Sequence, residues 1–188
     1  MAGRFTKDYF NGYRAITVPQ KNGRGTRRIL EYIGEWYGIG CTREEYIRLK
    51  TKIVCFALAI LAVYLPCSLS GASISMYRWV AAPAILSLVP MLFLFIGVVS
   101  FLCADEKWEL RVYHAGYTRI YRSAIGSSVL LGITAISCLL SFALIDQSVK
   151  ALDLVYLAGM LIDLACAVML VVTIKAHPAI VVQTPTIV

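Results

Sequence analysis

Hydrophobic residues are distributed unevenly along this chain, in which a polar leader is followed by four long apolar blocks. The blocks cover residues 53–69, 79–103, 124–145 and 154–174. An α-helix needs about 17–25 mainly apolar residues to cross the hydrocarbon core of a bilayer, and each block has such a length. The pattern therefore predicts an all-α integral membrane protein, in which four transmembrane helices pack as a bundle.

Polar segments around these blocks define the organisation of the chain. We expect a leader at residues 1–52, a central loop at residues 104–123 and a tail at residues 175–188. The central loop mixes charged side chains with aromatic ones, a composition that suits the headgroup layer of a membrane. We expect the helix of the second span to continue into this loop and Ala115-Gly116 to form a turn. The tail shows no regular pattern.

The leader contains a signal for a β-hairpin. Asn22-Gly23 is a strong turn signal because both residues tolerate the positive φ of a type I′ turn. With this pair at the turn, residues of matching chemistry face each other across the strands: Tyr13 and Tyr32, Arg14 and Glu31, Ile16 and Ile29. We predict a hairpin at about residues 13–33, and the alternative is a flexible loop. An isolated hairpin is marginal in water, so this one needs a surface to lie on.

A helix start is encoded at the end of the leader. Thr42 is followed three residues later by Glu45, the spacing of a capping box. This spacing predicts a helix that begins at residue 43 and runs directly into the first span. No apolar block precedes residue 53, so we expect no cleavable signal peptide and a first span that stays in the membrane as an anchor.

Basic residues indicate the orientation of the spans. The chain carries a net charge of +7; eleven Lys and Arg lie in the leader and four in the central loop, whereas the two short links between spans hold only Arg78 and Lys150. Because Lys and Arg near spans collect on the cytoplasmic side, we expect both termini in the cytoplasm, at a bacterial cytoplasmic membrane. The same rule explains the basic charge without nucleic acid, which we consider an unlikely partner.

Asp163 lies near the middle of the fourth predicted span, and no other acidic residue lies inside any of the four. An aspartate at that depth costs about 2.5–3.5 kcal/mol to insert, so it must face protein or water. The third span carries a polar stripe that includes Thr134, Ser137 and Ser141. We predict that the two faces pack together and that Asp163 forms a hydrogen bond at the level of Thr134 and Ser137. The alternative is a proton or cation site, although no Lys, Arg or His lies in any span to complete a relay.

Signals for catalysis and for bound metals are weak in this sequence. Its two histidines, His114 and His177, both lie outside the spans, and its six cysteines form no CxxC pair or zinc-ligand spacing. No HExxH, GxSxG or Walker A motif is present. We therefore predict no catalytic residues, no metal site and no cofactor, and we do not expect an enzyme.

The remaining hypothesis is that this protein binds a partner or lipid headgroups. We expect the leader and the central loop to dock anionic lipid headgroups or a partner, through basic and aromatic side chains that include Arg24, Arg27, Arg28, Trp36, Trp108, Tyr117 and Tyr121. The predicted function is that of a non-catalytic accessory or assembly subunit, which acts with itself or with another membrane subunit. The alternative is a small oligomeric transporter or channel for protons or cations, centred on Asp163.

Overall fold

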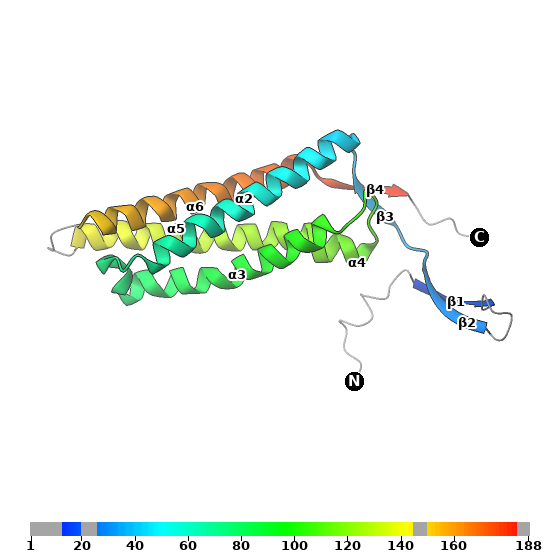
Figure 1. The fold of residues 1–188 in the computed structure, drawn as a ribbon, viewed down its shortest axis with the longest axis horizontal. Coiled ribbons are helices and arrows are strands. Elements are labelled where there is room, and N and C mark those ends of the chain that lie inside the picture. The colour runs from blue at the N-terminus through cyan, green and yellow to red at the C-terminus, as the bar shows by residue number, and fades with distance from the viewer. Residues whose placement is uncertain (1–12, 20–25, 145–149, 184–188) are drawn as a thin grey trace.

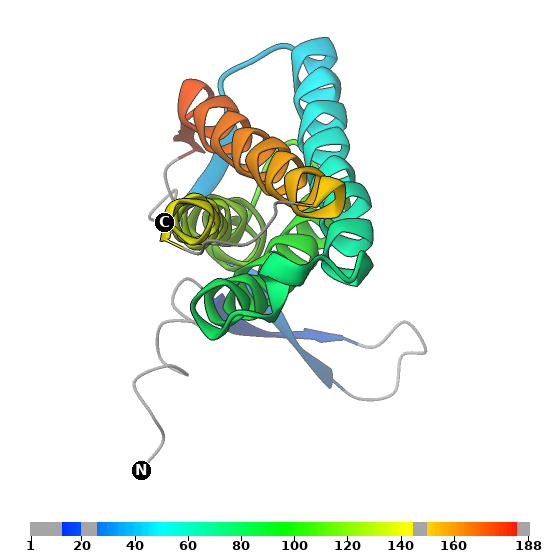
Figure 2. The same ribbon diagram turned by 90° about the vertical axis from the view of Figure 1, so that its left-hand side faces the viewer.

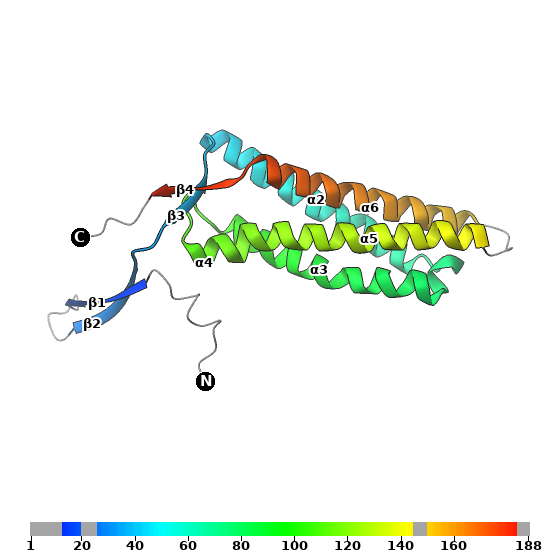
Figure 3. The same ribbon diagram turned by 180° about the vertical axis from the view of Figure 1, so that it is seen from behind.

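The computed structural model describes residues 13–19, 26–144 and 150–183. Four long helices pack side by side: α2 (Arg43–Leu69), α3 (Arg78–Leu102), α5 (Arg119–Leu144) and α6 (Ala151–Ala176). Figure 1 and Figure 3 show that α2 and α5 begin, and α3 and α6 end, at the same end of this bundle, which we call the near end. The opposite end, where α2 ends and α3 begins, is the far end.

All four helices are long and apolar enough to cross a membrane. Their most apolar windows have mean hydropathies of 2.0–2.6, yet only 28–33% of the residues in each window are buried inside the protein. About two thirds of the residues in each apolar window are therefore at least partly exposed. A soluble monomer rarely exposes a continuous apolar surface of that extent, whereas lipid covers one without cost.

The predicted helix start and the predicted hairpin are both confirmed. At the start of α2, the Glu45 amide donates to Thr42 Oγ1 at 3.4 Å and the Thr42 amide donates to Glu45 Oε2 at 2.9 Å. Strand β1 (Tyr13–Pro19) pairs with strand β2 (Thr26–Tyr32) in the expected antiparallel register, with Tyr13 opposite Tyr32 and Ile16 opposite Ile29. The Asn22-Gly23 turn itself lies outside the described residues.

The central loop differs from its prediction. Helix α3 ends at Leu102 and does not continue into the loop. Ala115-Gly116 is not a turn, because the short helix α4 (Leu110–Tyr113) leads through a π-helical segment, η2 (His114–Thr118), straight into α5. The glycine serves close packing instead: a Cβ on Gly116 would lie 3.3 Å from the backbone of Phe101. A side chain at residue 116 would force α3 and η2 apart by a few tenths of an ångström.

The tail, expected to be irregular, contributes a strand. Residues Ala179–Gln183 form β4, which pairs antiparallel with β3 (Trp36–Ile39) of the leader. This pairing joins segments more than 130 residues apart, so no local pattern could reveal it. Figure 2 looks along the bundle from the far end and shows the β1–β2 hairpin reaching out to one side of the helices.

At the far end, the Asp153 side chain joins the first link to the start of α6. This residue is only 5% exposed. Its carboxylate accepts the amide of Ile74 at 2.9 Å and the amide of Lys150 at 3.2 Å. The Ile74 amide belongs to the short 3₁₀ helix η1 (Ser73–Met76), which links α2 to α3. One carboxylate therefore holds the first link against the start of α6, where its negative charge also suits the helix dipole.

Close contact between α2 and α6 depends on Gly159. A Cβ added at this residue would lie 2.1 Å from Cys67 Sγ, whereas a Cβ on Gly132 of α5 would lie 4.0 Å from its nearest neighbour, a side-chain atom of Leu164. Cys67 is therefore buried against α6. The two glycines offer a matched pair of sites, one tightly enclosed and one with ordinary clearance.

We expect Gly159→Ala to lower the free energy of unfolding by about 1–3 kcal/mol, because it overpacks the α2–α6 contact. Gly132→Ala should cause no loss. Thermal unfolding in detergent would measure both. Adding Cys67→Ala to Gly159→Ala removes the opposing sulfur and should restore much of the stability; equal stability of the two single variants would contradict the packing argument.

Candidate functional site

Aromatic side chains from four separate segments converge at the near end. This near-end cluster consists of Tyr37 from β3, Tyr46 from α2, Phe101 from α3, and Trp108, Tyr113 and Tyr117 from the central loop. Tyr37 stacks on Tyr113 with ring centroids 4.7 Å apart, and Trp108 meets Phe101 edge to face at 5.4 Å. The cluster fixes the leader and the central loop against the end of the bundle.

Trp108 lies at the centre of this cluster and is 1% exposed. Its indole Nε1 donates to the Asp105 carbonyl at 2.6 Å and to the Tyr46 hydroxyl at 3.3 Å. Its backbone pairs in both directions with Tyr37, at N–O distances of 2.7 and 2.8 Å. Every polar group named here has a partner. The prediction that Trp108 is an exposed docking residue is therefore wrong.

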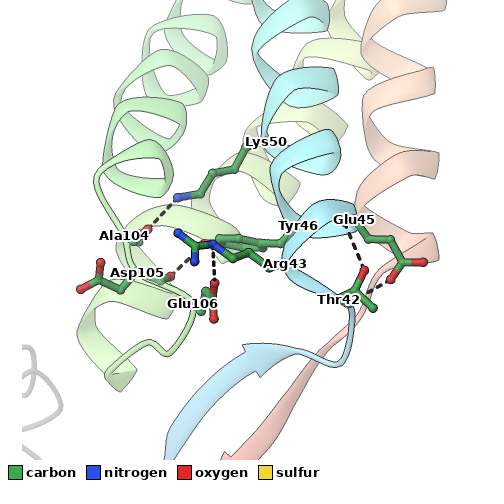
Figure 4. A network of polar contacts seen from close by, with 8 residues as sticks. All are labelled: Thr42, Arg43, Glu45, Tyr46, Lys50, Ala104, Asp105 and Glu106. Atoms are coloured by element: carbon green, nitrogen blue, oxygen red, sulfur yellow. Dashed lines mark hydrogen bonds and ion pairs between the residues drawn. The ribbon is translucent and has the colours of Figure 1, made fainter.

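Polar contacts close the end of α3 beside the cluster, as Figure 4 shows. Lys50 Nζ donates to the carbonyls of Leu102 at 3.2 Å and Ala104 at 2.7 Å. A cation at a helix C-terminus satisfies carbonyls that lack a partner within the helix and suits the helix dipole. The same ammonium lies 4.7 Å from the ring centroid of Tyr46, whose hydroxyl donates to the Asp105 carbonyl at 2.9 Å.

Tyr117 attaches the tail to the same assembly. Its hydroxyl lies 2.9 Å from the Ile174 carbonyl and 2.7 Å from the His177 carbonyl, at the C-terminal end of α6. Tyr121, one turn further along α5, is half-buried against the core. Both tyrosines are thus half-buried, and their part in docking stays a prediction.

The hairpin is fixed to the bundle at its base by two tyrosines. The Tyr13 hydroxyl donates to the carboxylate of Glu109, and the Leu110 amide donates to the Tyr32 hydroxyl at 3.1 Å. The Tyr32 hydroxyl donates in turn to the Glu35 carbonyl at 2.7 Å. Burial, together with the hydrogen bond to Glu109 and its charge, raises the pKa of Tyr13 to about 12, so this donor keeps its proton at physiological pH.

Beyond its base the hairpin is open. Arg14 and Arg28 are exposed, and so are two isoleucines, Ile29 at 44% and Ile33 at 49%. Of the other predicted docking residues, Trp36 is half-buried against Tyr32. Arg27 lies in β2 opposite Val18, and Arg24 lies outside the described residues. Among the predicted docking residues whose burial the structure describes, Arg28 of the hairpin is the exposed one.

A second candidate site is Asp163, which is 0% exposed and therefore faces the interior of the bundle. Neither carboxyl oxygen has a hydrogen-bond partner among the described residues. The hydrogen bond predicted at the level of Thr134 and Ser137 is not formed, since the Thr134 hydroxyl donates to the Leu130 carbonyl of its own helix at 2.9 Å. β-Hydroxyl side chains commonly satisfy themselves this way in apolar helices.

The polar stripe of α5 does face inward, as the spacing of its residues suggested. Ser127 and Thr134 are fully buried and Ser141 is 3% exposed, whereas Ser137 is half-buried. Ser141 Oγ donates to the Ser137 carbonyl at 2.8 Å and accepts the indole N–H of Trp79 from α3, also at 2.8 Å. The Ser127 hydroxyl has no partner among the described residues.

One small pocket opens at the near end, with a volume of about 140 Å³. It is lined in part by Cys41 and by Arg43 and Glu106, whose charged groups lie 3.6 Å apart. Burial raises the pKa of the Cys41 thiol, which makes it a poor nucleophile at neutral pH. Within the described part of the chain, no three His, Cys, Asp or Glu side chains group to hold a metal ion.

We expect Trp108→Ala to cost about 3–5 kcal/mol of unfolding free energy, because it empties the centre of the near-end cluster. Trp79→Ala is the matched control. Trp79 is 56% exposed, and its polar loss is the hydrogen bond to Ser141, worth about 1 kcal/mol. Thermal unfolding in detergent would compare them, and equal losses would show that Trp108 has no special role.

The comparisons with known proteins add no relationship to this geometry. No protein-family model matches the chain, and no curated protein or solved structure matches it.

Proposed function

We propose that this chain is a membrane-embedded, non-catalytic docking subunit, which holds the β1–β2 hairpin in the cytoplasm for a protein partner. One observation carries the proposal: the hairpin is fixed at its base by Tyr13 and Tyr32, yet its strands expose both basic and apolar side chains. An isolated two-stranded hairpin is marginal in water. The attachment of such a hairpin to the bundle is therefore best explained by a role for the side chains that its strands expose.

The membrane part of the proposal rests on the outward faces of the four helices. Their exposed side chains are dominated by large apolar residues, including Leu86, Phe93, Ile136 and Val172. The near end carries most of the Lys and Arg, which favours the cytoplasmic side for that end. Both chain termini then lie in the cytoplasm, and a bacterial cytoplasmic membrane suits this arrangement.

The docking part of the proposal rests on the chemistry of the strands. Residues 13–19 and 26–32 hold three arginines against one glutamate, a net charge of +2. Two strands leave two outer edges whose backbone groups can pair with an added strand. We propose that the occupant is an acidic protein segment, supplied by another membrane subunit or by a second copy of this chain; anionic lipid is the competing occupant.

The orientation can be tested with cysteines added at exposed positions on the two ends. Lys150 lies at the far end and Glu44 in the first turn of α2 at the near end, and both are exposed. In intact cells a membrane-impermeant thiol reagent should label Lys150→Cys above the wild-type background. Glu44→Cys should be labelled only after permeabilisation. The opposite pattern would place the near end outside the cell.

The docking surface can be tested by photocrosslinking in native membranes. A photoreactive amino acid in place of Ile29 should give a discrete protein adduct, because this side chain is exposed on the hairpin. The same probe at Glu44 is the control and should give none. An adduct of twice the mass of the chain would identify a second copy, and any other discrete mass another subunit.

Charge reversal provides the second arm of this experiment. Arg14→Glu combined with Arg28→Glu should markedly reduce the adduct from the Ile29 probe, because like charges would then face the acidic partner. Thermal unfolding of the helix bundle should change little, since both arginines are exposed and only the cross-strand pair of Arg14 with Glu31 is lost. Only lipid adducts at Ile29, or an adduct that charge reversal does not change, would contradict the proposal.

A further inference from the structure

Helix α6 carries two buried aspartates with opposite surroundings. Asp153 is 5% exposed, and its oxygens accept two backbone amides, from Ile74 and Lys150. Asp163, near the middle of the same helix, is 0% exposed, and neither of its oxygens has a hydrogen-bond partner among the described residues. The two hydrogen bonds of Asp153 explain why its carboxyl is buried. No such contact explains the burial of Asp163.

The surroundings of Asp163 offer no compensating charge. Cys67 on α2 and Cys166 on α6 are close enough to interact with it electrostatically, and both are thiols. Residues 124–145, which hold the α5 face packed against α6, contain no ionisable side chain other than Cys138, and residues 79–103 of α3 contain only Cys103. No cationic side chain lies in any of the four apolar blocks.

These surroundings decide what the carboxyl can bind. An ionised carboxylate away from water and without a partner is very costly, and such a group takes up a proton instead. A metal cation would need several oxygen ligands. Within the described residues no group of acidic, Cys and His side chains assembles around Asp163. A proton needs only the carboxyl oxygen itself.

The buried hydroxyl groups of α5 leave Asp163 without a partner. A Cβ on Gly132 of α5 would lie 4.0 Å from a side-chain atom of Leu164, which places Asp163 close to the depth of residue 132. Thr134, two residues further along α5, donates to the Leu130 carbonyl of its own helix. Ser127 is five residues from Gly132, roughly 7.5 Å along the helix axis at a rise of 1.5 Å per residue. The proton-binding group at this depth is therefore the carboxyl alone.

We propose that Asp163 is an exchangeable proton-binding site in the bundle interior. In the binding step, a proton from hydronium forms an O–H bond with one carboxylate oxygen and leaves water behind. Release reverses this step. The site is independent of the hairpin, and it would give the chain a proton-linked activity in addition to docking.

Infrared spectroscopy of the purified full chain tests this directly. A protonated carboxyl gives a C=O stretching band apart from those of carboxylates and amides, and the band shifts when deuterium replaces the proton. At neutral pH the wild type should show this band, and it should shift on transfer to D₂O. Asp163→Asn, which keeps the size but cannot ionise, should lack the band. Asp153→Asn, the matched control on the same helix, should retain it.

Each other result overturns the proposal. Absence of the band in wild type, or its persistence in Asp163→Asn, would show that Asp163 holds no proton. A band that D₂O never shifts would identify a sealed structural carboxyl. Charge reversal at Arg14 and Arg28 should leave the band unaltered, which separates this site from the docking surface.

Discussion

Trp108 can be buried only if its polar groups find partners, because each unpaired group away from water costs roughly 1–3 kcal/mol. The Asp105 carbonyl and the Tyr46 hydroxyl serve the indole, and the backbone of Tyr37 serves the main chain. These partners come from the leader, the first long helix and the central loop. Pairing the polar groups of this one residue therefore brings three segments together. The resulting arrangement positions the hairpin and the tail strand.

Local signals in the sequence predicted the local structure well. The capping box at Thr42 and the register of β1 against β2 depend on residues close together in the chain, and both were predicted. The four long apolar helices could be predicted for the same reason, since their length and apolarity are properties of single segments. The pairing of β3 with β4 could not, because neither strand is long or patterned enough to signal a partner at the other end of the chain.

The candidate sites could also be predicted only in part from the sequence. Spacing predicted that Thr134 and Ser141 face inward, and it identified Asp163 as unusual. Spacing could not predict that Thr134 would bond its own helix, because that choice depends on side-chain rotamers. Composition also cannot distinguish an aromatic residue that binds a partner at the surface from one that packs in the core. Trp108 and Tyr117 were assigned to the surface on composition alone, and the structure places both in the near-end cluster.

The β3–β4 pairing has a consequence for biogenesis. Strand β3 is synthesised before the first long helix, and β4 follows the last one. The sheet they form can close only when all four helices have been made and α6 has brought its C-terminal end back to the near end. Until then the edge of β3 that pairs with β4 stays open. Closure of this sheet can therefore only follow the synthesis of all four long helices.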